Sequence, residues 1–158
     1  GKEIKLTPKG KELAESVVRR HRLAERMVVE MIGLEWHKAH REAHRLEHAI
    51  SPEVEERLLQ VLGYPDTNPY GRPIPGYSSD PVPMRSMGKA LQGETVRVQQ
   101  VPEEDMSLLA FFDSNNIKPG VAVTVKELAA FKGTITLRID GEEVVLGMEV
   151  AQNIMVSA

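Results

Sequence analysis

Six of the ten prolines of this chain lie between Pro65 and Pro83, and this cluster constrains the fold more than any other feature of the sequence. Proline fixes its φ angle and has no backbone N–H, so a segment this rich in proline cannot run as a helix or a central strand. Gly71 and Gly76 lie among the prolines and favour turns. We therefore expect residues 65–93 to form a linker, with a folded unit on either side of it.

The sequence before the prolines has helical periodicity. Thr7-Pro8 is a helix start signal, with the threonine as N-cap and the proline in the first turn, and Gly33 ends the segment. A second helix is expected over residues 36–50, where apolar side chains recur every three or four residues. Ser51-Pro52 stops it and caps a third helix over residues 53–62. The apolar faces of the last two helices are large enough to predict a homodimer that buries them.

The sequence after the prolines has the alternation of β-strands. Strands are expected over residues 95–101, 121–126, 134–139 and 144–146. Asp140-Gly141 is a strong hairpin signal, and a helix is expected over residues 105–115. Short strands at this spacing predict a small barrel of roughly 65 residues. The expected fold class is α+β, with a helical domain, a proline-rich linker and a small β-barrel domain.

The composition excludes several kinds of site and partner. The chain has no cysteine, so a transition-metal site would need imidazole, carboxylate, carbonyl or thioether ligands. No apolar run could cross a membrane and the first residues lack the apolar core of a signal peptide, so we expect a cytoplasmic protein without membrane contact. Residues 1–63 carry 12 Lys and Arg against 11 Asp and Glu, and residues 64–158 carry 8 against 12. Neither part has the basic surplus of a domain that binds DNA by itself.

All five histidines lie in the first two predicted helices. Four side chains of the second helix stand at spacings i, i+4, i+7 and i+8 and so share one strip of its surface: His40, His44, Glu47 and His48. His21 and Glu25 on the first helix are also four residues apart and could hold one cation from adjacent turns. Imidazole and carboxylate suit Mn²⁺, Fe²⁺, Zn²⁺, Co²⁺ or Ni²⁺. Six candidate ligands on two helices favour a metal site over the alternative of solvated helix faces.

Residues 6–76 resemble the diphtheria toxin repressor family of iron- and manganese-dependent transcriptional regulators. The segments that carry the resemblance are LTPKGKELA, RRHRLAERMV, HREAHRLEHAIS, EVEERLLQVLG and YPDTNPYGRPIPG. Residues 90–156, with IKPGVAVTV and GEEVVLGMEVAQNIMV, are similar to that family's SH3-like domain. The resemblance implies a helical dimerisation and metal-binding domain at 7–76, a linker at 77–89 and an SH3-like (FeoA-like) domain at 90–158. It implies that residues 1–6, including a short alternating segment, are the remnant of a winged-helix wing, with the DNA-reading helix-turn-helix missing.

The resemblance also implies two metal sites. The ancillary site would use His21, Glu25 and His40, completed by Gln100 and Glu103 of the SH3-like domain. The primary, regulatory site would use His44, Glu47 and His48 together with a methionine of the helix-turn-helix domain, which has no counterpart here. Arg22, Asn68 and Arg72 match positions near the family's anion contact.

His44 is the point at which this sequence departs from the family, whose members usually place cysteine or glutamate there. The metal preference therefore does not carry over directly. The cofactor implied is Mn²⁺ or Fe²⁺, with Zn²⁺, Co²⁺, Ni²⁺ or Cd²⁺ able to substitute.

The expected function is the metal-sensing and dimerising part of a divalent-metal-dependent repressor of metal homeostasis genes, not an enzyme. Operator DNA would be bound only through the missing N-terminal domain. One alternative is a small zinc-dependent hydrolase, because His44, Glu47 and His48 spell H-x-x-E-H. A second is a structural dimerisation module with a peptide-binding SH3-like domain. The aromatic content of 4% counts against the second alternative, because proline-peptide grooves are lined by aromatic side chains.

Overall fold

The computed structural model describes residues 5–158 and divides into two compact units, one ending at Ser79 and the other spanning Asp80–Ala158. The expected wing remnant at residues 1–6 lies mostly outside the described residues, and Lys5 and Leu6 belong to no strand. A helical domain followed by an antiparallel sheet confirms the expected fold class. The two units are taken in turn.

The first unit is helical, and its helices begin where the capping signals placed them. Its elements are α1 (Pro8–Glu30), a 3₁₀ turn (Trp36–Lys38), α2 (Ala39–Leu46), a second 3₁₀ turn (Glu47–Ala49) and α3 (Pro52–Val61). The Thr7 hydroxyl accepts a hydrogen bond from the N–H of Gly10 at 3.0 Å, and the Ser51 hydroxyl accepts one from Val54 at 3.2 Å. Each serine or threonine thereby satisfies an N–H that the first turn leaves without a partner.

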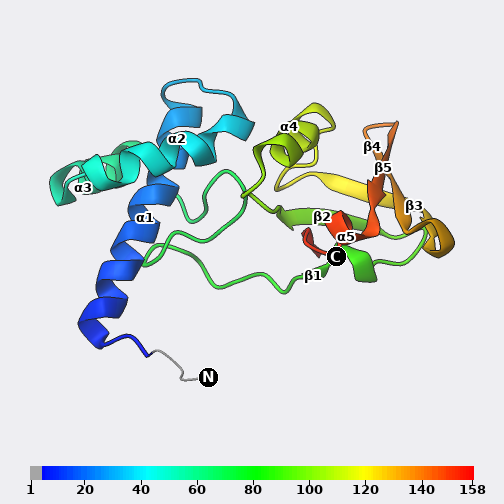
Figure 1. The fold of residues 1–158 in the computed structure, drawn as a ribbon, viewed down its shortest axis with the longest axis horizontal. Helices are drawn as coiled ribbons and strands as arrows, with labels where there is room; N and C mark the ends of the chain where they lie inside the picture. Colours follow the sequence, from blue (N-terminus) through cyan, green and yellow to red (C-terminus); the bar gives the residue numbers. More distant parts are fainter. Residues whose placement is uncertain (1–4) are drawn as a thin grey trace. The chain divides into compact units, whose positions relative to one another are not determined.

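The core of the helical unit forms where α2 and α3 lie across α1 (Figure 1). Its buried members are Leu23, Ala24, Ala43, Ile50, Leu58, Leu59 and Ile74. Ala39 and Ala43 have no exposed surface and so pack within their own chain, whereas Trp36 and Leu46 of the same stripe are only partly buried. The expected dimer face stays a prediction, and Val54 and Val61 of the third predicted helix are among its exposed apolar side chains.

The segment after α3 is a packed loop. Tyr70 and Ile74 are completely buried in it. Arginines of α1 hold it in place: Arg19 Nε donates to the Pro75 carbonyl at 2.8 Å, and Arg26 Nε donates to the Thr67 carbonyl at 2.6 Å. The expectation of a linker that begins at residue 65 is wrong, because the prolines here shape a turn-rich loop whose backbone carbonyls are satisfied by α1.

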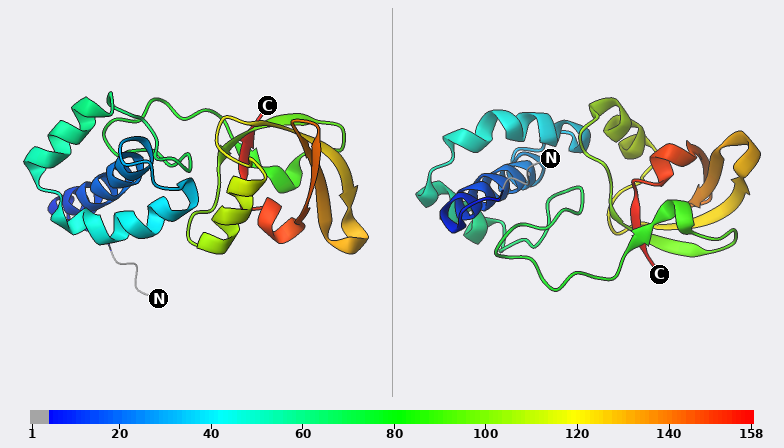
Figure 2. Two further views of the ribbon diagram at one scale, coloured as in Figure 1. Left: turned by 90° about the horizontal axis from the view of Figure 1, so that it is seen from above. Right: turned by 60° about the horizontal axis from the view of Figure 1, so that its bottom comes forward.

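The second unit is a six-stranded antiparallel sheet with the strand order β1-β6-β2-β3-β4-β5. The strands are β1 (Arg85–Ser86), β2 (Thr95–Gln100), β3 (Ala122–Ala129), β4 (Thr134–Ile139), β5 (Glu142–Gly147) and β6 (Met155–Ser157). Asp140 and Gly141 join β4 to β5 with φ angles of 50° and 82°, as a two-residue hairpin turn requires. The β4–β5 hairpin (orange) rises steeply from the other strands, so the sheet is strongly curved (Figures 1 and 2).

Two helices accompany the sheet, α4 (Met106–Ser114) and α5 (Met148–Ala151). The sequence predicted α4 but missed α5, β1 and β6, which are too short to show periodicity. The expected linker at 77–89 also extends too far, because β1 pairs with β6 and Met87 is completely buried. Residues 85–89 therefore belong to the sheet unit. Within residues 5–158, no helix is both long enough and apolar enough to cross a membrane.

Candidate metal centre

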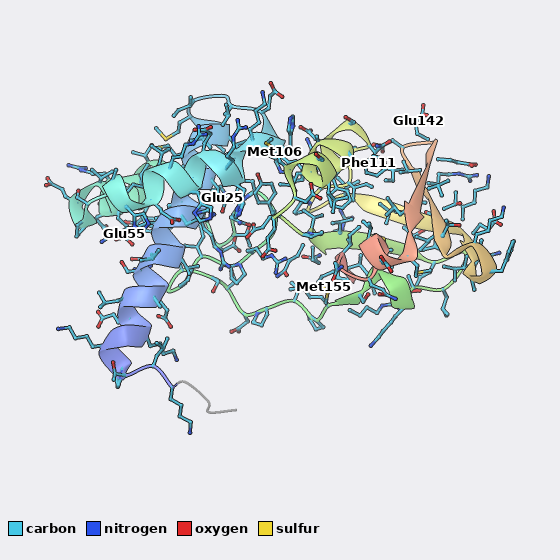
Figure 3. The ribbon with its side chains drawn as sticks, in the orientation of Figure 1. Glu25, Glu55, Met106, Phe111, Glu142 and Met155 are labelled. Atoms are coloured by element: carbon cyan, nitrogen blue, oxygen red, sulfur yellow. The ribbon has the colours of Figure 1, made fainter. Side chains whose placement is uncertain are left out.

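The candidate site lies where α1 crosses α2, and Glu25 is its centre (Figure 3). The Glu25 side chain has no exposed surface, and His21, one turn earlier on α1, is also buried. His40 lies in the first turn of α2 and is partly buried. A carboxylate in this position is costly unless it is paired, so its partners determine what the site can do.

Three side chains meet there, the same three that the resemblance assigned to the ancillary site. The His40 Nδ1 atom lies 3.2 Å from Glu25 Oε2 and 3.1 Å from His21 Nε2. The His21 Nε2 atom lies 3.4 Å from Glu25 Oε1. One ligand atom from each of the three residues falls within 4.8 Å of the others. Two imidazoles and one carboxylate at this spacing can converge on a single cation.

A second group of candidate ligands contains His21, His44 and Glu47, again with one atom from each within 4.8 Å. The His21 Nδ1 atom lies 2.7 Å from Glu47 Oε2, and the His44 Nδ1 atom lies 3.3 Å from Glu47 Oε1. His48 lies beside the group, with its Nε2 atom 3.4 Å from Glu47 Oε1. The sequence did not anticipate that His21 would face both groups, because helical spacing relates side chains within one helix and not between two.

The charges of this cluster alter the pKa values of its two most buried members. Burial lowers the pKa of His21, but hydrogen bonds with Glu25 and Glu47 and their negative charges outweigh it, so the pKa is raised above 6.5. Burial raises the pKa of Glu25, but hydrogen bonds from His21, His40 and Asn68 and the charge of His21 outweigh it, so the pKa is lowered below 4.5. The raised pKa favours the protonated form of His21, so a metal ion bound there would compete with a proton for the ring.

Asn68 of the packed loop supports the site through Glu25 Oε1, the same oxygen that faces His21. Its Nδ2 donates to Glu25 Oε1 at 2.9 Å, and its Oδ1 accepts from the N–H groups of Tyr70 at 3.1 Å and Arg72 at 2.7 Å. The Tyr70 hydroxyl donates to the Trp36 carbonyl at 2.6 Å. Sequence reasoning assigned Asn68 to an anion contact and missed this role. The Asn-Pro-Tyr-Gly turn was the available signal, but it predicts a turn and not its target.

The other two residues of the expected anion contact are Arg22, which lies on α1, and Arg72, which lies on the packed loop. Arg22 Nη1 donates to the Pro73 carbonyl, and Arg72 Nε is buried without a hydrogen-bond partner among the described residues. Gln100 ends β2 and Glu103 lies in the loop before α4, both partly buried and both in the sheet unit. The anion contact and the ligand roles of Gln100 and Glu103 stay predictions.

The residues present fit a divalent transition metal. Glu25 offers a buried carboxylate that already faces two imidazoles, and imidazole and carboxylate are suitable ligands for Mn²⁺, Fe²⁺ or Zn²⁺. His21 and Glu25 each have a further hydrogen-bond partner, Glu47 for the histidine and Asn68 for the carboxylate. Such outer partners commonly orient metal ligands.

Comparison with known proteins agrees with this architecture. Residues 7–76 match the profile described as the iron dependent repressor, metal binding and dimerisation domain, and residues 85–158 match the FeoA domain. The iron-dependent repressor IdeR of Mycobacterium tuberculosis is 36% identical, over 98% of this chain and 73% of its own length. The diphtheria toxin repressor of Corynebacterium diphtheriae is 35% identical over the same shares.

Solved structures give the same result. A manganese-dependent transcriptional repressor in complex with manganese superposes with a TM-score of 0.87 and 36% identity, over 98% of this chain and 74% of that one. The IdeR structure of T. acidophilum superposes with a TM-score of 0.83 and 29% identity, over 98% of this chain and 71% of that one.

The fold and the site together define a metal-binding and dimerisation domain of a transcriptional regulator, joined to an SH3-like FeoA domain. The chain belongs to the iron-dependent repressor family, to which the diphtheria toxin repressor also belongs. The alternative of a zinc hydrolase is not supported, because these relatives are repressors. The H-x-x-E-H match of His44, Glu47 and His48 reflects the spacing of side chains on one helical turn.

Proposed function

We propose that this chain binds Mn²⁺ or Fe²⁺ through His21, Glu25 and His40, and through His44, Glu47 and His48, and that binding regulates a dimeric repressor of metal homeostasis genes. The observation that carries the proposal is the completely buried Glu25 carboxylate facing His21 and His40 at 3.4 and 3.2 Å. Two relatives of this chain are described as an iron-dependent repressor and a manganese-dependent repressor. ScaR, another related structure, holds Zn²⁺ or Cd²⁺, which supports substitution by these ions and by Co²⁺ or Ni²⁺.

The chain's own residues supply the mechanism. His21 and Glu25 belong to α1 and His40 to α2, so binding one ion requires these helices to keep one spacing. A divalent metal held by these residues would supply positive charge in place of a proton on His21, and His21, Glu25 and His40 would hold it from both helices at once. Because the metal binds this arrangement more tightly than others, the arrangement becomes more populated. Regulation follows if operator binding through a DNA-reading domain outside this chain needs the same arrangement.

The homodimer is also part of the proposal. Met31 at the end of α1 lines an apolar pocket with Val54, Leu58 and Val61 of α3. Three of these side chains are about half exposed or more, which favours burial against a second copy with two-fold symmetry. We expect a dimer in sedimentation experiments, and a monomer for Val61→Glu, which would bury a charge in that interface. We also infer that the protein is cytoplasmic, because a regulator of genes acts where the DNA is.

The test is metal stoichiometry. Purified chain dialysed against Mn²⁺ or Zn²⁺ should retain metal, whereas the triple variant His21→Ala, Glu25→Ala, His40→Ala should lose one equivalent. A triple change at exposed α2 and α3 positions outside the cluster, Arg41→Ala, Arg45→Ala, Glu56→Ala, serves as the control and should retain all of it. Equal metal content in the parent and in the cluster variant would contradict the proposal.

A further inference from the structure

His21 faces a different partner with each of its two ring nitrogens. Its Nδ1 atom lies 2.7 Å from Glu47 Oε2, the shortest contact within the cluster. Its Nε2 atom faces the other way, 3.1 Å from His40 Nδ1 and 3.4 Å from Glu25 Oε1. The ring therefore stands between the two groups of candidate ligands.

The partner of Nδ1 determines which nitrogen of a neutral His21 can bind metal. An ionised carboxylate only accepts hydrogen bonds, so a contact of 2.7 Å requires that Nδ1 carries a hydrogen. Neutral imidazole has one N–H, and so Nε2 is left with a lone pair. That lone pair points toward Glu25 and His40, where the ancillary metal would sit.

Glu47 can hold this hydrogen bond while it also serves the other group. It is 8% exposed, and its two oxygens face different neighbours. Oε2 faces His21, whereas Oε1 faces His44 at 3.3 Å and His48 at 3.4 Å. One oxygen can therefore orient His21 while the other remains available as a ligand.

We infer that Glu47 is a positioning residue for the His21, Glu25 and His40 site, acting through the tautomer and orientation of the His21 ring. This inference rests on the proposed function, which places a metal at that site. Glu47 was expected only as a ligand of the primary site, and this inference gives it a second role in the ancillary site. Loss of Glu47 should therefore weaken the ancillary site even when the primary site is already disabled.

The experiment uses the full chain with His44→Ala and His48→Ala, which disable the primary side and leave one site. In this background Glu47→Leu removes the acceptor at similar volume, and Glu47→Gln keeps an oxygen that can accept from Nδ1. Mn²⁺ affinity should fall about 10- to 100-fold for Glu47→Leu, the usual cost of losing an outer partner of a metal ligand, and recover largely for Glu47→Gln. Glu42→Leu, which removes a nearby carboxylate on α2 that pairs with Arg41 and Arg45, should leave affinity unchanged.

The ¹⁵N chemical shifts of the His21 ring report its tautomer, which would not change if Glu47 only stabilised the fold. Metal-free protein, at a pH where its histidines are neutral, should show the Nδ1–H tautomer with Glu47 present and lose that preference with Glu47→Leu. An Nε2–H tautomer in the parent, or unchanged affinity in Glu47→Leu, would overturn the inference. If the background protein binds no metal, the proposed function fails, and the tautomer measurement still decides the role of Glu47.

Discussion

The two sides of the histidine cluster differ in how firmly the fold holds them. On the Glu25 side, the carboxylate is completely buried and fixed by His21, His40 and Asn68. On the other side, the side chains of His44 and His48 are 67% and 77% exposed. Both face Glu47, which is itself held by His21.

This difference separates a preorganised site from an open one. Ligands whose rotamers are fixed by packing and hydrogen bonds lose little conformational freedom on binding, whereas exposed imidazoles must be ordered by the metal itself. The resemblance implied an additional methionine ligand for the open side, which suits its exposure. We therefore expect the Glu25 side to bind first in this chain.

Glu25→Ala should have the largest effect of any single change. It removes the carboxylate that both His21 and His40 face and leaves His21 with Glu47 as its remaining carboxylate partner, so metal binding at this side should fall below detection. Breaking a buried ion pair should also lower the free energy of unfolding by about 3 kcal/mol. His48→Ala, on the exposed side, should change it by less than about 0.5 kcal/mol. Urea unfolding with chelator measures both variants, and equal losses would remove the distinction between the two sides.

Asn68→Ala should have the next largest effect. It deletes the donor to Glu25 Oε1 and releases two backbone N–H groups of the loop, so Mn²⁺ affinity should fall about 10- to 100-fold. Asn116→Ala removes an exposed asparagine that contacts Asp140 in the sheet unit and should have no effect. Isothermal titration compares the two. Parent-like affinity in Asn68→Ala would mean that packing alone orients Glu25.

Above about pH 6.5, the contribution of His21 to metal-free stability should fall with rising pH while metal affinity rises. The pKa of His21 is raised, so its contribution to metal-free stability is complete below about pH 6.5 and is lost as pH rises through the raised value. The pKa of Glu25 is lowered, so its contribution is present above about pH 4.5 and is lost as pH falls through the lowered value. Metal must displace the His21 proton, so affinity should keep rising above pH 6.5.

Chemical unfolding with chelator and Mn²⁺ titration, both from pH 5.5 to 8.5, measure these two trends. His48→Ala should preserve them, because His48 touches neither His21 nor Glu25 in any contact described above. Metal affinity that levels off well below pH 6.5 would show that His21 is not a ligand.

His44→Glu should have the smallest effect. It should change the selectivity between metals more than the total amount of metal bound. A carboxylate there weakens only at low pH, so the affinity of the open side should depend less on pH between about 5.5 and 7. It should also raise Mn²⁺ affinity relative to Zn²⁺, because harder oxygen ligands suit Mn²⁺. Paired titrations with both metals test this, with Arg45→Glu as an exposed control on the same helix. An unchanged profile and an unchanged metal ratio would leave His44 outside the site.

Much of the fold was predictable because its signals are local. Thr7, Ser51 and Asp105 cap helices through their own side chains, and Asp140-Gly141 sets the β4–β5 hairpin, all within four residues. Strand β4 matches its predicted span, residues 134–139, because alternation is a property of the strand itself. The short strands β1 and β6 escaped prediction because pairing, rather than their own pattern, defines them.

The sequence by itself also brought His21 and Glu25 onto one face of α1 and placed His40, His44, Glu47 and His48 along one strip, because helical periodicity fixes such spacings. Only the tertiary structure decided how these strips meet. It turned His21 between Glu25 and Glu47 and packed a proline-rich loop against α1, so that Asn68 reaches Glu25 across 43 residues of chain. Contacts of this kind depend on packing and on satisfying buried polar groups throughout the helical unit, and no local pattern encodes them.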